Sequence, residues 1–590
     1  MVLKNGMTVK AGLLLSRLEC QSTPSEYDRL PENAATEIAP QRDTDASTIT
    51  VDGVPSLQAA TSAGRLAGAA GIVTASVILS RFLGFLREWT VAHQVGSNAT
   101  TDAYYAAFTL PDFLNYLMAG ASLSVIFIPV FTKYLAQGDE DEGWRVFSTV
   151  ITFMSILLVA AIGLGEIFAP QLINITTPGF QPAEKAHVIF YTRLMLPAQF
   201  CFVMGSIMAA VQYAKHQFLV PSLALVIYNS FIVLGGWTLA RYVGMTGFAL
   251  GVLVGAILGN LLLQIFGARR AGARFRPNLR LGHPGFKLFL KLAVPIMLAL
   301  SLTFTDNWII RWFGSYLHAA SITWLQYAKI LMQVPLTSLG QAVGVVSFPI
   351  LSRLYSEGKL DEFDRTLSAA LKGMLAMMLP VSALLIAQSE PFVYLVFSHT
   401  RLRGPDFHAT GIALALFALG MFAWAAQYLL SRGFFAIHNS WTPAVVGTVV
   451  TLASLPVYRY LVHRHGYWGL ALSSSIGITA FMLVLFVLLN RATKSASVRS
   501  NIIFFLKLSV ASAAAGYATY FVDQRLESHL PWRSMTGAFV LLVIGSSVGL
   551  AVTLVLAKLL RIKEVTAHLT RVTRMLQRRV LQRAQPQPAE

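Results

Sequence analysis

The sequence predicts an all-α polytopic membrane protein with about 14 transmembrane helices. We expect two parallel-repeat lobes of six helices plus two extra C-terminal helices. Hydrophobic residues make up 55% of the 590 residues and charged residues only 13%, about half of the ~25% typical of a soluble domain. Apolar segments near the ~20 residues that cross a bilayer follow one another from residue 66 onward. In addition, motifs in the first half recur in the second. These observations exclude a water-soluble globule, a disordered chain and a disulfide scaffold.

Residues 1–65 are polar and rich in Ser, Thr, Asp, Glu and Pro, so they predict a disordered cytoplasmic N-terminal tail. The apolar run Leu13–Leu15 is too short for a signal-peptide core or a membrane span. The two cysteines, Cys20 and Cys201, lie far apart in dissimilar surroundings. They offer neither a disulfide framework nor metal-ligand spacing.

Fourteen apolar segments are long enough to span a membrane. Helices are expected because these segments lack the alternation of barrel strands, and because lipid offers no partner to unpaired backbone groups. The predicted spans are 66–93, 101–132, 146–173, 185–213, 218–241, 245–268, 287–314, 319–352, 367–390, 408–437, 442–462, 466–490, 502–523 and 535–560.

Positive charge gathers in the loops that follow even-numbered spans, so the positive-inside rule places both termini in the cytoplasm. The net charge of +18 is attributed to this membrane face and not to nucleic-acid binding. The expected domains are an N-lobe (66–268), a basic cytoplasmic loop (269–286), a C-lobe (287–490), a final helix pair (491–560) and a basic cytoplasmic tail (561–590). Apolar residues at helical spacing in that tail suggest a basic helix on anionic lipid.

Two motifs recur at nearly the same offset along the chain. Pro129, Lys133, Gly138, Asp141, Glu142 and Arg145 realign on Pro349, Arg353, Gly358, Asp361, Glu362 and Arg365, and the motif around His216 realigns on that around His438. Six spans separate the copies, so both halves cross the membrane in the same direction. Such a parallel repeat is typical of transporters that hold substrate between two lobes.

Ionisable residues inside predicted spans are costly and by default mark a transport pathway. Arg81 lies near the middle of the first span, with Arg87 and Glu88 shortly after it. The two arginines are ~9 Å apart along the helix axis and ~240° apart around it. They could line one broad cavity, with Glu88 pairing with one of them. A buried ion pair that only locks two helices is the alternative.

Further charges occur in the second, seventh and eighth spans. Asp102 is either a cavity residue or a helix N-cap. Asp306 lies deep in the seventh span, whereas Arg311 fits an interfacial anchor as well as a cavity residue, and Lys329 lies deep in the eighth span. The expected inventory, led by Arg81, Arg87 and Lys329, is net cationic. Because guanidinium groups bind phosphate or pyrophosphate bidentately, we expect an anionic substrate.

Several prolines and glycines inside spans are expected to break or bend helices that line a cavity. They are Pro111, Gly120, Pro129, Pro295, Pro335, Gly340, Gly344 and Pro349. The chain has no Walker loop, HExxH, CxxC or strand-following GxGxxG motif. We therefore expect no enzyme activity, no ATP hydrolysis, no cofactor and no bound metal. Histidines such as His216 and His438 are assigned structural roles at loop ends.

Taken together, the motifs resemble the MurJ/MviN family of lipid II flippases, within the wider class of multidrug, oligosaccharidyl-lipid and polysaccharide exporters. The resemblance covers residues 66 to 560 and rests on Ser80-Arg81-x-Leu83-Gly84-x-x-Arg87-Glu88, Thr101-Asp102-Ala103, Leu110-Pro111, Phe127-x-Pro129, Thr177-Pro178-Gly179-Phe180, Tyr327-Ala328, Gln333-x-Pro335 and Arg432-x-x-x-Ala436 with Thr442-Pro443. It implies a V-shaped two-lobed fold, a central cationic cavity and a groove for a polyprenyl tail formed by the last two spans. Arg81, Arg87 and Asp102 match functional residues of the family.

The chain departs from the family pattern in its cavity positions. Family members carry basic residues a few positions after the Leu-Pro of the second span, where this chain has Asn115 and Tyr116. The arginine expected in the eighth span is replaced by Ile330, with Lys329 one position earlier. That neighbour points ~100° away on a helix. Asn115, Glu88, Asp306 and Gln333 complete the set of expected cavity or ion-coupling residues.

The resemblance implies a flippase that carries undecaprenyl-pyrophosphate-linked peptidoglycan precursor from the cytoplasmic to the outer leaflet of the bacterial inner membrane by alternating access. Arg81, Arg87, Lys329 and Asp102 are expected to bind substrate. A cation or the membrane potential is expected to drive the cycle of a monomer. The alternatives are a flippase for another lipid-linked oligosaccharide, a drug or metabolite exporter, a membrane glycosyltransferase or ligase, and a scaffold without transport. The short outer loops argue against a glycosyltransferase.

Overall fold

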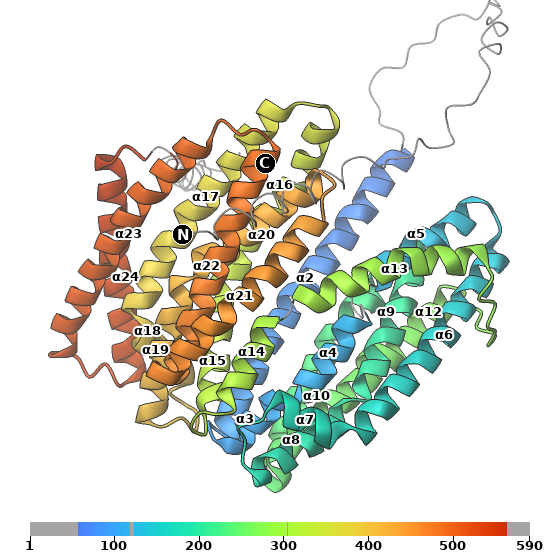
Figure 1. The fold of residues 1–590 in the computed structure, drawn as a ribbon, viewed down its shortest axis with the longest axis horizontal. Coiled ribbons are helices and arrows are strands. Elements are labelled where there is room, and N and C mark those ends of the chain that lie inside the picture. The colour runs from blue at the N-terminus through green and yellow to red at the C-terminus, as the bar shows by residue number, and fades with distance from the viewer. Residues whose placement is uncertain (1–56, 119–122, 304, 563, 565–590) are drawn as a thin grey trace, which may run out of the picture. The chain divides into compact units, whose positions relative to one another are not determined.

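Every regular element in the described part of the chain is a helix. The computed structural model describes residues 57–118, 123–303, 305–562 and 564, and it contains no strand within those ranges. The chain divides after Gly64 into two units, and the description below concerns the second unit, residues 65–590. Most of the predicted tails (1–65 and 561–590) and Gly120 lie outside the described residues, so these predictions stay untested. The predicted all-α fold class is confirmed (Figure 1).

The helices of the first half run from α2 to α12. They are α2 (Leu57–Gln94), α3 (Ala99–Ala107), α4 (Thr109–Leu117), α5 (Leu123–Ala136), α6 (Glu140–Ile167), α7 (Ala169–Thr176), α8 (Pro182–Met195), α9 (Ala198–Ala214), α10 (Leu219–Val243), α11 (Met245–Gly255), the π-helix η2 (Ala256–Leu262) and α12 (Leu263–Arg270).

The rest of the chain runs from α13 to α24. These helices are α13 (Pro284–Thr303), α14 (Thr305–Gly314), α15 (Ser321–Pro335), the π-helix η3 (Leu336–Gly340), α16 (Gln341–Ser356), α17 (Leu360–Ala387), α18 (Ser389–Phe397), α19 (Gly404–Leu419), α20 (Met421–Ala436), α21 (Trp441–His465), α22 (Tyr467–Ala492), α23 (Val498–Glu527) and α24 (Met535–Leu559).

Many of these helices are long and apolar enough to cross a membrane, so this is a multi-span membrane protein. Within the described residues ten helical segments meet that condition, or eleven when the pair α19 and α20, bent by 41°, is counted as one span. The predicted number of 14 is not confirmed. The three other predicted spans lie on α2, on the interrupted segment from α3 to α5, and on α13 followed by α14.

Helix breaks coincide with some of the prolines singled out in the sequence. Pro335 ends α15 and is followed directly by the π-helix η3, as expected where proline removes a backbone donor and clashes with the preceding turn. In contrast, Pro129 and Pro349 stand inside α5 and α16 without ending them. The second π-helix, η2, contains no proline and had no sequence signal.

The same helix pairings occur in both halves. In the first half α3 packs on α8, α5 on α9, and α10 on α11; in the second half α15 packs on α19, α16 on α20, and α21 on α22. Figure 1 shows the two sets of helices as separate groups. The predicted parallel repeat is therefore present in the packing as well as in the motifs.

Backbone conformation repeats at the same positions. Gly138 and Gly358, which close the turns before α6 and α17, both have positive φ, at 74° and 71°. Glycine adopts this conformation without the cost that a Cβ brings. Three further pairs share positive φ: His216 with His438, Gly244 with Gly466, and Gly272 with Lys494. The two histidines lie in the turns just after α9 and α20, at loop positions such as those predicted for them.

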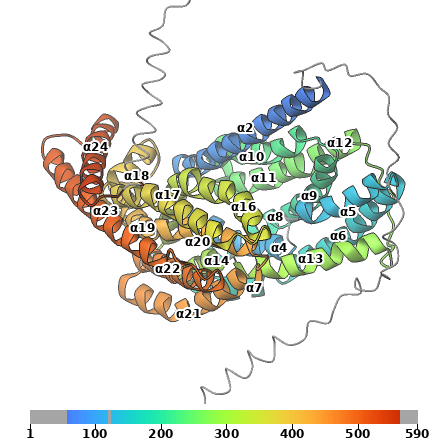
Figure 2. The ribbon, with the colours of Figure 1, turned by 90° about the horizontal axis from the view of Figure 1, so that it is seen from above.

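Helix α13 belongs to the second repeat by sequence but packs mainly on the first half. It contacts α4, α5 and α6, and also α21 of the second half. Its Phe286 and Phe289 are buried in a cluster with Phe127 and Phe147. Both views place α13 beside α5 and α6 (Figures 1 and 2). Its continuation α14 packs instead on α15, α21 and α22, so the predicted seventh span is shared between the halves.

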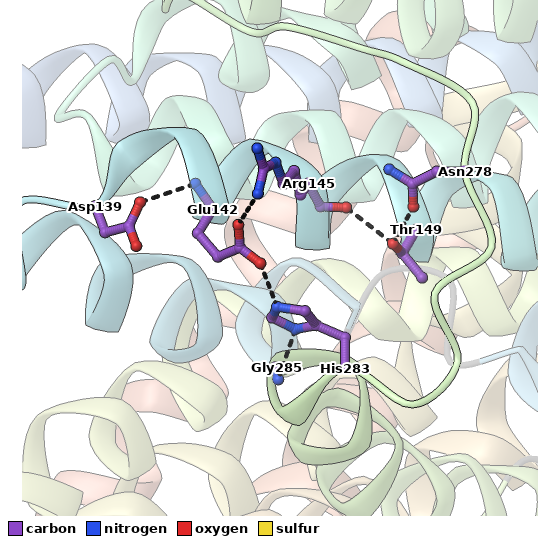
Figure 3. Close-up of polar contacts among 7 residues, drawn as sticks. All are labelled: Asp139, Glu142, Arg145, Thr149, Asn278, His283 and Gly285. Atoms are coloured by element: carbon purple, nitrogen blue, oxygen red, sulfur yellow. Dashed lines mark hydrogen bonds and ion pairs between the residues drawn. The ribbon is translucent and has the colours of Figure 1, made fainter.

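A polar network fastens the segment between the halves to the start of α6 (Figure 3). Glu142 accepts hydrogen bonds from Arg145 and from His283 Nε2, both at 2.7 Å, and the Gly285 N–H donates to His283 Nδ1 at 3.0 Å. Three further contacts hold the segment: Thr149 with Asn278, Asp141 with Arg274, and Ser148 with the backbone of Arg274 and Arg276. Asp139 caps α6 by accepting a hydrogen bond from the Glu142 N–H. The linker is thus held on the first half.

The second half fastens its own following segment at the matching helix, α17. Asp364 accepts hydrogen bonds from the Ser497 hydroxyl at 2.7 Å and from its N–H at 3.2 Å. Ser368, which matches Ser148 in the repeat, donates to Asn501 at 2.5 Å. Helix α23 then packs along α17, and α24 packs on α23 and α18. Large apolar side chains such as Val510 and Leu559 are exposed on this pair, as expected for helices that face lipid.

Candidate functional site

Helix α2 presents three charged side chains at its second half. Arg81 is exposed and makes no hydrogen bond or ion pair with the described residues. Arg87 is 24% exposed, and its Nη2 lies 2.6 Å from Glu88 Oε1. The Glu88 side chain is 1% exposed, and its second oxygen accepts a 2.5 Å hydrogen bond from the Tyr105 hydroxyl. The predicted pairing of Glu88 with one arginine is therefore present, and the carboxylate is satisfied on both oxygens.

An aromatic group surrounds this cluster. The rings of Tyr104 and Tyr105 on α3 contact each other, and the Tyr105 ring contacts Tyr327 of α15 edge to face at 6.3 Å. Arg87 lies close enough to Tyr104 and to Tyr228 for their polar groups to interact electrostatically. The Tyr104 hydroxyl is buried without a hydrogen-bond partner among the described residues. An apolar wall with polar tips strengthens electrostatic interactions at Arg87, since it lowers the local dielectric constant.

A second ion pair bridges the two halves close to Arg87. Arg311 of α14 places Nη1 3.0 Å from Asp112 Oδ2 and 3.4 Å from the Thr109 hydroxyl, both on α4. Asp112 also interacts electrostatically with Arg87. The sequence interpretation left Arg311 open between an anchor and a cavity residue, and it did not single out Asp112. The only available signal was an acidic residue directly after the Leu110-Pro111 motif.

Lys329 and Asp306 are found together, within the second half. Lys329 Nζ lies 2.7 Å from Asp306 Oδ2 and 2.7 Å from Asn307 Oδ1, and the Tyr458 hydroxyl donates to Asp306 Oδ1 at 2.6 Å. Asp306 and Tyr458 line a cavity of about 120 Å³, together with Trp424, Ser474 and Phe481. In this structure the Lys329 ammonium group is therefore engaged by the second half's own acceptors.

Asp102 is buried and joins the halves directly. Its Oδ1 accepts hydrogen bonds from the backbone N–H and the hydroxyl of Thr323 on α15. Asp102 therefore caps a helix of the other half, whereas its own helix, α3, is capped by Asn98. The remaining candidates lie apart from this contact: Asn115 donates to Gln199 at 2.9 Å, and Gln333 is exposed.

Contacts between the halves gather where α2 ends and α3 and α15 begin. We call this set the junction. It comprises the Asp102–Thr323 cap together with Trp89 Nε1 to Val396 O, His93 with His399 O, Arg401 N to Ala92 O, Tyr327 OH to Gly96 O, Trp312 Nε1 to Ile175 O and Gly179 N to Ser315 Oγ. Gly179 allows a close approach, because a Cβ there would lie 2.6 Å from the Ser315 carbonyl oxygen. The junction ties the halves at one end of the helices.

No group of three or more His, Cys, Asp or Glu side chains suited to a metal ion occurs among the described residues. Among the described residues, Arg311 pairs with Asp112 across the halves and Arg87 pairs with Glu88 within the first half, while Arg81 is exposed without such a partner. These arginines can bind an anion, because guanidinium groups form bidentate hydrogen bonds with oxyanions.

A family of known proteins matches most of this chain. The family model described as lipid II flippase MurJ matches residues 91–543. A protein of Buchnera aphidicola subsp. Acyrthosiphon pisum (strain APS) named probable lipid II flippase MurJ is 26% identical over 450 residues, which cover 75% of this chain and 87% of that protein. One of the same name from Vibrio cholerae serotype O1 (strain ATCC 39315 / El Tor Inaba N16961) is 24% identical over 511 residues, covering 84% of this chain and 97% of that protein.

The fold has a close counterpart among solved structures. A lipid II flippase MurJ in an inward closed conformation superposes with a TM-score of 0.69 at 23% sequence identity, over 82% of this chain and 98% of that structure. The resemblance to a transport family rather than an enzyme family, drawn from the Arg81, Asp102 and Leu110-Pro111 motifs, is therefore confirmed. The matched region covers most of the helices of both halves, and the chain belongs to the lipid II flippase MurJ family.

Proposed function

We propose that this chain carries lipid II, the undecaprenyl-pyrophosphate-linked peptidoglycan precursor, from the cytoplasmic to the outer leaflet of the bacterial inner membrane. The observation that carries the proposal is Arg81 of α2, which is exposed and has no partner among the described residues, about one turn and a half before the partly exposed Arg87. A charge at the centre of a membrane helix costs at least ~2.5 kcal/mol against lipid. The side chain is stable there if it faces water or an anionic ligand between the halves.

The substrate binds through its pyrophosphate. Arg81 and Arg87 supply guanidinium groups on one helix, and the Glu88–Tyr105 contact fixes the direction in which Arg87 points. A bidentate guanidinium–phosphate contact is stronger and more directional than a contact with a single ammonium group. Asp102 acts at the junction, and Lys329 acts through its pairing with Asp306. The polyprenyl tail lies along the exposed apolar face of α23 and α24.

Transport follows alternating access. The positive-inside rule places both termini in the cytoplasm, which puts the junction at the outer surface of the membrane. In this conformation the junction seals the outer end, and its hydrogen bonds break when the lobes rock to release substrate outward. A monomer driven by a cation gradient or by the membrane potential completes the cycle. Family membership and the names of the curated relatives support this proposal.

Complementation tests the proposal. The chain is expressed in a bacterium depleted of its own lipid II flippase, beside Arg81→Ala and the control Arg193→Ala, which removes an arginine bonded to Glu166 within the first half. Rescue by the wild type and by Arg193→Ala, but not by Arg81→Ala, is expected. Rescue by Arg81→Ala at equal membrane levels would contradict the assigned role of Arg81.

One observation favours a second candidate, a flippase for another lipid-linked oligosaccharide. Asn115 stands where the family pattern has a basic residue, and it is engaged in a neutral contact with Gln199. A site with fewer cations suits a different headgroup. Mass spectrometry of lipid that co-purifies with the chain separates the two candidates: lipid II supports the first, and another polyprenyl-linked glycan supports the second.

A further inference from the structure

We propose that Arg311 and Asp112 form the second half of the anion site. In this arrangement Arg311 binds the substrate's pyrophosphate together with Arg87, and the Asp112 carboxylate holds Arg311 in place until the pyrophosphate displaces it. The inference rests on the proposed function, since it concerns how the same site recognises a lipid-linked pyrophosphate.

The position of Arg311 suits this role. It belongs to the second half, its guanidinium group reaches Asp112 of the first half, and its side chain is 13% exposed. Its two side-chain contacts, with Asp112 Oδ2 and with the Thr109 hydroxyl, both use Nη1. Nη2 and Nε form no hydrogen bond with the described residues. A guanidinium group has five N–H donors, so Arg311 keeps donors that a second oxyanion can use.

The charges around Asp112 form an alternating series. Asp112 is paired with Arg311 on one side and interacts electrostatically with Arg87 on the other, while Arg87 is paired with Glu88. The four charges sum to zero, so the site is balanced without a ligand. Carboxylate and phosphate bind guanidinium in the same bidentate way, but a pyrophosphate brings more charge and more acceptor oxygens. A pyrophosphate placed at Asp112 would face both arginines.

The alternative cation from the second half is already engaged. Lys329 is held by Asp306 and Asn307, which belong to the same half, and Asp306 in turn lines the cavity beside Tyr458. Asn115 and Ile330 carry no charge. Among the described residues singled out in this region, Arg311 is therefore the cation of the second half that lies between the halves.

A purely structural ion pair makes a different prediction. If Arg311 and Asp112 served only to lock the halves, removal of either partner would change ligand binding in the same direction. If Asp112 is a displaceable competitor, its neutralisation frees Arg311 and tightens pyrophosphate binding, whereas loss of Arg311 weakens it. The sign of the Asp112 effect therefore distinguishes the two roles.

The test measures binding of undecaprenyl pyrophosphate to the full-length chain in nanodiscs, with inorganic pyrophosphate as a soluble competitor. The variants are Arg311→Gln, Arg311→Lys, Asp112→Asn and Arg87→Gln, with Arg193→Gln as the control for loss of a carboxylate-paired arginine elsewhere. Arg311→Gln is expected to weaken binding about tenfold to a hundredfold, as for the loss of a charge-assisted contact. Arg311→Lys should recover part of this loss, Asp112→Asn should bind several-fold more tightly, and Arg193→Gln should match the wild type.

Each possible result tests one step of the proposal. Wild-type affinity in Arg311→Gln, with binding lost in Arg87→Gln, overturns the inference and leaves the proposed function standing. Wild-type affinity in both variants counts against the proposed function itself. Weaker binding in Asp112→Asn overturns the displacement step. If Arg311→Gln does not fold, the direction of the Asp112→Asn effect and the partial loss of binding in Arg311→Lys still distinguish a ligand-binding role of Arg311 from a purely structural one.

Discussion

Asp102 of the first half caps helix α15 of the second half by accepting two hydrogen bonds from Thr323, at 2.8 Å from the backbone N–H and 2.5 Å from the hydroxyl. The first N–H groups of a helix have no partner within the helix and carry a partial positive charge. The buried Asp102 carboxylate accepts a hydrogen bond from one of these groups, the Thr323 N–H, as a residue at the start of α15 would in a local cap. The junction is therefore held by a directional polar contact, which must break if the halves separate there.

Removing this cap should loosen the junction. In Asp102→Ala the Thr323 N–H is left buried without its acceptor, at a cost of about 1–3 kcal/mol. Hydrogen–deuterium exchange of residues 321–327 should accelerate about fivefold or more. Asn98→Ala is the matched control, because Asn98 caps α3 within its own half, and exchange should then rise at the start of α3. Unchanged exchange over 321–327 in Asp102→Ala would show that the cap does not secure the junction.

The hydroxyl of Tyr105 should stabilise the buried Glu88. Tyr105→Phe removes the 2.5 Å hydrogen bond to the carboxylate and leaves the ring contacts in place. A hydrogen bond to a charged group contributes about 1.5–3 kcal/mol, so thermal unfolding should shift to lower temperature. Tyr517→Phe, at a tyrosine that is 73% exposed, should leave the transition where it is. Equal transitions in all three proteins would indicate that Glu88 does not need this donor.

The pair of Lys329 and Asp306 should behave as a coupled unit. Lys329→Met leaves a carboxylate without its cation, at an expected cost of about 3–5 kcal/mol, whereas replacing both partners, as in Lys329→Met with Asp306→Asn, should cost less than the two single changes added together. Chemical unfolding of the four proteins measures this coupling. The exposed pair Arg353–Glu357 gives the comparison, since solvent screens surface pairs and they contribute little to stability. Additive effects at Lys329 and Asp306 would contradict the assigned coupling.

The linker between the halves should depend on Glu142. Glu142→Ala removes the acceptor of both Arg145 and His283 (Figure 3), so trypsin should cut more rapidly after Arg274, Arg276 and Arg280. The segment after α22 serves as an internal control, because it is fastened by Asp364 and not by Glu142. Cleavage there should keep its wild-type rate. Faster cleavage at both segments would point to a general loosening and not to a local contact.

Much of the fold follows from sequence pattern alone. Apolar length predicts helices because lipid leaves the backbone no other partner, and the offset motifs predict a repeat that the helix pairings and the matched positive φ values bear out. The breaks were harder to predict. Proline marks η3 but not η2, since a π-turn also depends on how closely neighbouring helices approach: a Cβ at Gly205 would lie 1.9 Å from the carbonyl oxygen of Asn260 in η2.

For the candidate site, the sequence predicts which charged residues lie within the membrane but not which residues they pair with. It indicates that Arg81, Lys329 and Asp306 lie within the membrane. It does not show that Lys329 pairs with Asp306 inside one half, while Arg311 reaches Asp112 in the other. Those pairings depend on the division of the predicted seventh span into α13 and α14 and on the packing between the halves. Both are tertiary properties without a local signature.

The shared position of α13 also bears on where the chain can be divided. The repeat suggests a cut within 271–283, giving two equivalent fragments. The packing of α13 argues against this cut, because Phe286 and Phe289 complete an apolar cluster of the first half. A first fragment ending before Pro284 would leave that surface uncovered, and the second would begin with an unsupported apolar helix. The first copy of the sequence repeat therefore ends before α13, whereas the part of the chain that buries the core of the first half extends through α13. In this protein the duplicated segment and the segment that packs as one unit do not end at the same residue.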